Sequence, residues 1–171
     1  LPQHKNITKL KEEVKFLEGM ISNLLLSDRL SMPYSKLELK KFTTSKIIEN
    51  LIEMFPTNHK RIKVNNQIPN EQIYIDETKF ILALRNLLDN AIKYSPINKN
   101  IEIIVVKNGE IKFQIKDMGI GISKDNIQKI TQPFFQVDQT SSTRGFGLGL
   151  TICKKIVESH NGRLSIESNP K

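Results

Sequence analysis

The sequence predicts a two-layer α/β sandwich with a mixed sheet, preceded by one long N-terminal helix. Three observations support this fold class: a heptad-like stretch over 7–30, apolar segments of helical period between short strand-like segments, and one strong hairpin signal. At 171 residues the chain is long enough for one domain with a small appendage. Helices and an extended hairpin that share one core bury their apolar faces best as two stacked layers.

The first predicted element is a helix from about Ile7 to Leu30. The apolar residues of this stretch step by three and four positions, as in a coiled-coil seam: Ile7, Leu10, Val14, Leu17, Ile21 and Leu24. Met32-Pro33 ends the helix, because a residue before proline is biased away from helical backbone. The apolar stripe needs a partner, and we expect a second chain or a further segment to cover it.

Short strands and a second helix are predicted next. Thr43 or Thr44 can cap this second helix and Pro56 closes it. Asn and Pro turns separate the strand candidates. The predicted ranges are a strand over Leu37–Phe42, the helix over Thr44–Met54, and strands over Arg61–Asn65 and Gln72–Ile75.

A nearly all-apolar helix is predicted from Asp76 to Tyr94, with Pro96 as the stop. Asn86, Asn90 and Lys93 lie at i, i+4 and i+7, so they form one polar stripe on this otherwise buried helix. Leaving a buried amide without a partner costs about 1–3 kcal/mol. Each asparagine therefore either bonds a neighbouring backbone carbonyl or faces a ligand. A stripe that ends in a lysine favours the ligand.

The rest of the chain is predicted from turn and cap signals. Asn108-Gly109 between two alternating segments is a strong hairpin signal. Asn161-Gly162 is a typical helix stop. The predicted ranges are a hairpin of Ile101–Lys107 and Glu110–Asp117, a short helix from the Ser123 cap to Ile130, a loop over Gln132–Arg144, a helix over Leu148–His160 and a last strand over Arg163–Glu167.

Two glycine clusters follow the polar stripe, and they hold five of the eight glycines: Asp117-Met-Gly119-Ile-Gly121 and Gly145-Phe-Gly147-Leu-Gly149-Leu150. Glycine lets the backbone approach a ligand closely. The second cluster opens a helix, whose free N–H groups can face a phosphate, and Arg144 stands just ahead of it. Asparagine supplies neutral oxygen ligands for a hard cation. Together these features predict a Mg-nucleotide site.

Composition excludes several classes of protein. A net charge of +8 permits nucleic-acid binding, but the lysines are scattered and aromatic residues make up only 6%, so we expect no nucleic-acid partner. No apolar stretch reaches the length of a membrane span, and no signal peptide is recognisable. The single Cys153 excludes an internal disulfide framework.

The ordered set of motifs resembles the N, G1, F and G2 boxes of bacterial sensor histidine kinases, in the GHKL ATPase superfamily. The matching segments are Asn86–Ser95, Asp117–Gly121, Pro133-Phe134-Phe135-Gln136 and Gly145–Leu150. The resemblance extends from about Leu37 to the end of the chain and implies the Bergerat ATP-binding fold. It also implies ATP and Mg²⁺ as cofactors.

The resemblance carries roles onto matching positions. Asn90 would hold Mg²⁺, Asn86 would act at the phosphates, and Lys93 would contact phosphate. Asp117 would read the adenine amine. The nucleotide-binding set that we assign is Tyr94, Asp117, Gly119, Gly121, Phe134, Phe135, Arg144, Gly145, Gly147, Leu148 and Gly149. In hydrolysing relatives a glutamate at the position of Asn86 activates water. Asparagine cannot act as that base, which favours phosphoryl transfer to a protein side chain.

Two departures from the family pattern stand out. Thr131 replaces the usual first phenylalanine of the F box, and no phosphoacceptor box is present among the three histidines, His4, His59 and His160. Residues 1–33 resemble the second helix of the dimerisation hairpin, and 34–171 the catalytic domain. We therefore expect a truncated kinase that cannot autophosphorylate, because the acceptor histidine is missing.

The resemblance implies transfer of the ATP γ-phosphoryl to a histidine, for relay to an aspartate of a response-regulator receiver domain. The parent protein would be a homodimer through the hairpin, with this domain in the cytoplasm and an anchor in the bacterial inner membrane. The alternative is a non-catalytic module in which ATP orders the loop and changes a protein contact.

Overall fold

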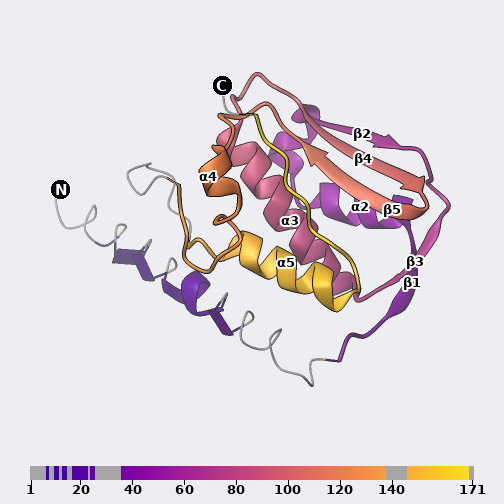
Figure 1. Cartoon of the computed structure of the whole chain (residues 1–171), viewed down its shortest axis with the longest axis horizontal. Helices are drawn as coiled ribbons and strands as arrows, with labels where there is room; N and C mark the ends of the chain where they lie inside the picture. The colour runs from indigo at the N-terminus through magenta and orange to yellow at the C-terminus, as the bar shows by residue number, and fades with distance from the viewer. Residues whose placement is uncertain are drawn as a thin grey trace.

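The computed structural model describes residues 36–137 and 146–169, together with 7, 10, 11, 13, 14, 17–22, 24 and 25. The main part of the chain contains both helices and strands (Figure 1). In chain order they are β1 (Lys40–Thr43), α2 (Thr44–Glu53), the 3-10 helix η1 (Pro56–Arg61), β2 (Ile62–Asn66), β3 (Gln72–Ile75), α3 (Glu77–Tyr94), β4 (Ile101–Asn108), β5 (Glu110–Lys116), α4 (Lys124–Ile127) and α5 (Gly149–Ser159).

The main sheet has the order β2-β4-β5. Strand β2 runs parallel to β4, whereas β4 and β5 form an antiparallel hairpin. The sheet is therefore mixed, as predicted. The hairpin turns at Gly109, whose φ of +74° suits a glycine. Strands β1 and β3 form a separate antiparallel pair.

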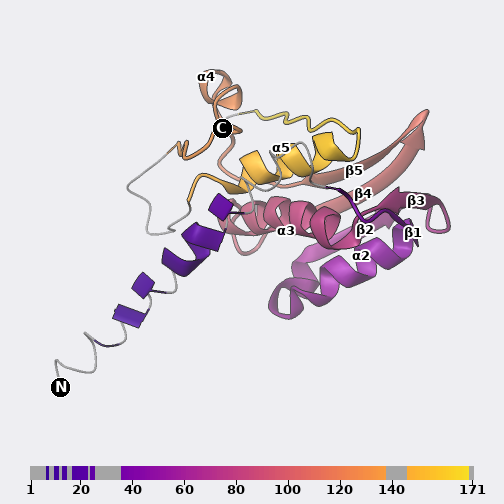
Figure 2. The same cartoon turned by 90° about the horizontal axis from the view of Figure 1, so that it is seen from below.

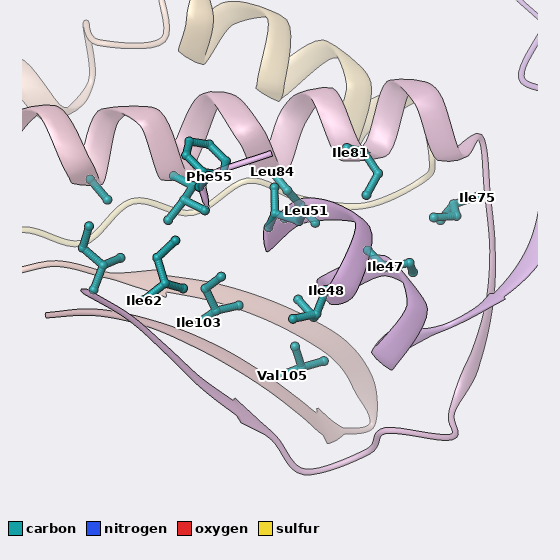
Figure 3. Close-up of a cluster of buried hydrophobic side chains, with 13 residues drawn as sticks. Ile47, Ile48, Leu51, Phe55, Ile62, Ile75, Ile81, Leu84, Ile103 and Val105 are labelled. Atoms are coloured by element: carbon teal, nitrogen blue, oxygen red, sulfur yellow. The ribbon is translucent and has the colours of Figure 1, made fainter. Parts of the chain in front are cut away.

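The main core lies between this sheet and the helices α2 and α3 (Figures 2 and 3). Alternate residues of β4 point into the core, and Ile101, Ile103 and Val105 are at most 1% exposed. Figure 3 shows side chains of α2 and α3 meeting those of the sheet. This packing of a helical layer on one face of a mixed sheet confirms the predicted two-layer arrangement.

A second cluster joins α3 to α5, which lie side by side (Figures 1 and 2). Its buried members are Ala83, Leu148, Ile152, Cys153 and Ile156. The small Ala83 on α3 lets α5 approach closely. The helix that follows the second glycine cluster is thereby fixed against the helix that carries the asparagines.

Polar contacts tie the far ends of these two helices. The side chain of Asp76 caps α3 by accepting from the backbone N–H of Lys79 at 3.2 Å. The backbone N–H of Asp76 donates to Nε2 of His160, at the end of α5, at 3.0 Å, while Nδ1 of His160 lies 2.7 Å from the carbonyl oxygen of Ile156. The ring of His160 therefore joins the start of α3 to the end of α5.

Three local expectations were wrong. Residues Arg163–Glu167 form no strand; Leu164 and Ile166 are half-buried and alternate with exposed neighbours, but this segment pairs with no strand of the described chain. Ser123 occupies the N-cap of α4 without a side-chain hydrogen bond. Strand β1 begins only at Lys40, since β3 supplies partners from that residue onward.

The predicted N-terminal helix lies partly outside the described residues. Those described between 7 and 25 have helical backbone, and their apolar side chains, such as Leu10 at 65% and Ile21 at 54%, are exposed. One continuous helix from Ile7 to Leu30 therefore stays a prediction. In the part of the chain that the structure describes, no helix has the length and apolar content to cross a membrane.

We predict that Asp76→Asn lowers the free energy of unfolding by about 1–2 kcal/mol at pH 7. Burial raises the pKa of Asp76, but hydrogen bonds from Lys79 and from the amides of Lys79 and Glu38 outweigh it, so the net pKa is lowered. A lowered pKa stabilises the fold above the unfolded value, near 3.8, and this stability is lost as the pH falls through the folded value.

Urea unfolding of both proteins between pH 3 and 7 measures this effect. The difference between wild type and Asp76→Asn should shrink as the pH falls below about 4. Asp125→Asn, at an exposed aspartate, is the control and should leave stability nearly unchanged. A difference that is independent of pH would contradict the charge-based account.

Candidate functional site

The polar stripe of α3 is half-buried, as the sequence predicts for a ligand-facing surface. Asn86, Asn90 and Lys93 all have intermediate exposure. The amide nitrogen Nδ2 of Asn86 is buried without a hydrogen-bond partner. This group does not bond a backbone carbonyl, so the alternative of a satisfied core asparagine fails for Asn86. A buried donor of this kind is stabilised when a ligand supplies an acceptor.

The N-terminus of α5 lies beside Asn86. Helix α5 begins at Gly149 and no side chain caps it. A Cβ built on Gly149 would lie 3.9 Å from both Cγ and Oδ1 of Asn86. The first N–H groups of a helix have no intrahelical partner, and the helix dipole makes this end favourable for anions. The unpartnered amide and the uncapped helix start therefore share one small region.

Cys153 lies in the cluster that joins α5 to α3. The thiol donates to the carbonyl oxygen of Ala83 on α3, at 3.3 Å between Sγ and the oxygen. Burial raises the pKa of Cys153 to about 12. The thiol therefore stays protonated and unreactive at neutral pH, and it helps to fix α5 against α3.

A carboxylate lies at the other end of the stripe. Asp117 follows β5, and its Oδ1 accepts from the backbone N–H of Gly119 at 2.7 Å and from the hydroxyl of Ser95 at 3.3 Å. A Cβ on Gly119 would lie 2.7 Å from Oδ1 of Asp117 and 2.8 Å from the carbonyl oxygen of Tyr94. Only glycine fits at position 119, because its backbone lies so close to both groups that no side chain has room.

Lys93 and Tyr94 are the last two residues of α3. Nζ of Lys93 lies 4.9 Å from the centre of the Tyr94 ring, within cation–π range. The Tyr94 side chain is 43% exposed. An exposed aromatic ring suits a flat heterocyclic base, and the lysine adds positive charge to the polar stripe.

The glycine-rich loop is closed at its base by backbone contacts. The N–H of Phe134 donates to the carbonyl oxygen of Gly147 at 2.9 Å. Both residues have φ near +65°, and a Cβ on Gly147 would lie 2.6 Å from the carbonyl carbon of Phe134. Phe135 is half-buried, whereas the Phe134 side chain is 57% exposed. The two ends of the intervening segment are therefore held together.

The other predicted residues fall in different places. Arg144 and Gly145 lie outside the described residues. Gly121 has φ +77°, which explains its glycine. Leu148 is 1% exposed and packs in the second cluster, so only its backbone can face a ligand.

The structure thus brings the predicted residues together in two groups along α3. One group holds Asn86 and Gly149, and the other holds Tyr94, Asp117 and Gly119. The eight residue steps from Asn86 to Tyr94 span about 12 Å of helix. Asn90 lies one turn from each end, between the region suited to phosphate and the region suited to a base.

Sequence reasoning missed three contributors to this arrangement: Ser95, Cys153 and Thr151. Ser95 reads as a helix end before proline, and Cys153 as a core residue. The hydroxyl of Thr151 donates to the carbonyl oxygen of Thr131 at 3.0 Å and so ties α5 to the segment before Phe134. Their partners lie 20 or more residues away in the sequence, and nothing in the local pattern marks these three residues.

No carboxylate, histidine or cysteine cluster offers a conventional metal centre here. Among the described residues, no group of three or more such side chains could hold an ion. The amide of Asn90 fits Mg²⁺, which prefers oxygen ligands and takes few of them from the protein when substrate phosphates and water complete its shell. The donor set therefore suits a metal that arrives with a nucleotide.

A helix with a half-buried polar stripe, packed beside an uncapped helix start and ending near a hydrogen-bonded carboxylate, is an arrangement suited to a nucleotide. Comparison with known proteins agrees. Residues 75–171 match the family described as histidine kinase-, DNA gyrase B- and HSP90-like ATPase. The chain belongs to this family, and it carries the catalytic, ATP-binding domain of a sensor histidine kinase.

Individual relatives are two-component sensor proteins. Sensor protein RprX of Bacteroides fragilis is 29% identical over 93% of this chain, and sensor protein kinase WalK of Staphylococcus saprophyticus is 30% identical over 95%. The solved structure of full-length ShkA in complex with AMPPNP aligns with 93% of this chain and 34% of its own, at a TM-score of 0.75 and 23% identity, which shows a shared fold. The chain spans 32% of RprX and 28% of WalK.

We predict that Gly147→Ala lowers the free energy of unfolding by at least about 2 kcal/mol, or opens the loop base and lowers nucleotide affinity. The matched control is Gly109→Ala. Both glycines have positive φ, but a Cβ on Gly109 meets nothing within 4 Å. The control should show only the cost of left-handed backbone, about 1 kcal/mol.

Urea denaturation and titration with a fluorescent ATP analogue measure both effects. The excess loss in Gly147→Ala over Gly109→Ala reports the collision with Phe134. Equal stability and equal nucleotide affinity in the two variants would show that the loop base is not built as described.

Proposed function

We propose that this chain binds Mg-ATP along the stripe of α3 and transfers the γ-phosphoryl to a protein histidine, for relay to an aspartate of a response-regulator receiver domain. The observation that carries the proposal is the buried, unpartnered Nδ2 of Asn86 beside the uncapped start of α5. A phosphate oxygen supplies the missing acceptor. Membership of the kinase family supports the same assignment.

Different residues contact different parts of the nucleotide. Asp117 accepts a hydrogen bond from the adenine amine, Tyr94 lies against the base, and Lys93 offers positive charge to the phosphates. Asn86 and the N–H groups that begin with Gly149 hold phosphate oxygens. We assign Arg144 and Gly145 to the same loop on sequence alone. Gly147 shapes the loop base.

Asn90 would hold Mg²⁺ through its amide oxygen, and the ion would supply neutralising charge to the triphosphate. The protein's own part is mainly positioning, because phosphoryl transfer needs alignment and charge compensation more than covalent help. Asn86 has no basic group with which to activate water. The site therefore favours transfer to a protein side chain over rapid hydrolysis.

We propose that the receiving histidine is none of the three in this chain. His160 has both ring nitrogens engaged, with Asp76 and with Ile156. His59 lies in η1, and no acceptor motif surrounds it in the sequence. His4 lies outside the described residues and lacks the family's acidic and arginine neighbours.

The exposed apolar stripe of the N-terminal residues supports a homodimer through paired helices. Ile7, Leu17 and Leu24 are each about half exposed. A second copy of the same helix would cover side chains with this coiled-coil spacing.

As in the expectation from sequence, we propose a parent protein with this domain in the cytoplasm and an anchor in the inner membrane.

We predict that Asn90→Ala and Asp117→Ala each weaken binding of a fluorescent ATP analogue by at least about tenfold, because each removes a contact to the ligand or its metal. Asn65→Ala, at an exposed position on β2, is the matched control. Thermal unfolding checks that all variants fold. Unchanged affinity in both site variants would overturn the proposed site.

A second experiment separates a kinase from a module that only binds ATP. The chain is incubated with ATP, magnesium and a separate protein that carries an acceptor helix from a sensor kinase. We expect acid-labile phosphate on the acceptor protein, and none with Asn90→Ala. Nucleotide binding without transfer would favour the non-catalytic module, and steady release of phosphate would favour a hydrolysing enzyme.

A further inference from the structure

We propose that Ser95 is a specificity-determining residue: its hydroxyl fixes Asp117 so that one carboxylate oxygen alone faces the base, and this selects a 6-amino purine over a 6-oxo purine. The inference rests on the proposed nucleotide site and deepens it. Ser95 acts through Asp117, so it is a positioning residue rather than a catalytic one.

The first step of the argument is the division of labour between the two oxygens of Asp117. Both described hydrogen bonds, from the Gly119 N–H and from the Ser95 hydroxyl, end on Oδ1. A carboxylate oxygen has two lone pairs. Two donors therefore saturate Oδ1 and leave Oδ2 as the acceptor for a ligand.

The second step is that Ser95 is itself held firmly. The residue is only 8% exposed and is the C-cap of α3. Arg61 binds the backbone just beyond it: Nη2 donates to the carbonyl oxygens of Ser95 at 3.4 Å and Pro96 at 2.9 Å, and Nε donates to that of Lys99 at 3.1 Å. Proline at the next position restricts the backbone further. The hydroxyl is thus presented from a fixed point.

The third step concerns the other side of the carboxylate. Gly119 lies in contact with Oδ1 of Asp117 and with the carbonyl oxygen of Tyr94, where no side chain would fit. Its φ is not in the left-handed region, so the glycine serves close approach. The carboxylate is therefore held between the end of α3 and the loop after β5, and rotation about its Cβ–Cγ bond would break both hydrogen bonds at once.

The chemical consequence follows from what Oδ2 can do. An ionised carboxylate only accepts hydrogen bonds. A 6-amino group donates one to it, whereas a 6-oxo group brings a second acceptor and repels it. A carboxylate free to rotate could retreat from the 6-oxo group. One held by Ser95 cannot, so the serine sharpens the discrimination between the two bases.

The test measures the affinities of ADP and IDP by calorimetry for the wild type and Ser95→Ala. We expect the ratio of the Kd for IDP to the Kd for ADP to fall about tenfold in Ser95→Ala. A carboxylate that is free to rotate is less well aligned with the 6-amino group of ADP and can turn away from the 6-oxo group of IDP. Ser159→Ala is the matched control, because its hydroxyl bonds a backbone carbonyl of α5 away from Asp117.

A further pair keeps the test decisive if Ser95→Ala folds poorly. This pair is Ser95→Thr and Ser95→Val, because threonine and valine have nearly the same shape and differ in the hydroxyl. Threonine should keep the wild-type selectivity and valine should lose it. Equal selectivity in threonine and valine, or an equal loss of affinity for ADP and IDP in Ser95→Ala, would overturn the inference.

The outcomes also separate this inference from the proposed function. A wild-type chain that binds neither nucleotide would remove both proposals. A wild type that binds and discriminates, with Ser95→Ala and Ser95→Val unchanged, would remove only the role of Ser95 and leave the nucleotide site intact.

Discussion

The close packing of α5 on α3 is the contact on which the rest of the site depends. It is made by Ala83 and Cys153 and by three aliphatic residues of the second cluster. This packing places the start of α5 beside Asn86, which joins two ordinary helix features in one region suited to an anion. The phosphate that we propose there would supply the acceptor that the buried amide of Asn86 lacks.

Polar contacts at the far end keep the two helices in this arrangement. His160 bonds the backbone of Asp76, and the carboxylate of Asp76 caps α3 and pairs with Lys79 at 2.7 Å. These groups lie away from the stripe and have no direct role in the chemistry. Their effect is to remove freedom from the angle between α3 and α5, which is what preorganisation of a phosphate site requires.

The ends of the glycine-rich loop illustrate the same principle at shorter range. Phe134 and Gly147 share a backbone hydrogen bond, and Thr151 bonds the carbonyl oxygen of Thr131. On the other side, Gly19 of the N-terminal segment lies against Phe146, since a Cβ built there would be 3.4 Å from the ring. The start of α5 is thus fixed by contacts from the core, the preceding loop and the N-terminal segment.

The sequence by itself determined the local features of this protein. The polar stripe on α3, the Asn108-Gly109 hairpin and the glycines after β5 follow from periodicity and turn chemistry, which depend on near neighbours. The same local rules predicted a strand over Arg163–Glu167, and there they were wrong. Alternation describes which side chains are buried, but a strand also needs a partner for its backbone groups.

Only the tertiary structure decided the contacts that complete the site. Ser95 and Asp117 are 22 residues apart, Ala83 and Cys153 are 70 apart, and Asp76 and His160 are 84 apart. No periodicity connects such positions, because their distance is set by how helices and sheet pack rather than by the backbone between them. The sequence therefore named the groups that we propose contact a ligand, and the packing selected those that hold them in place.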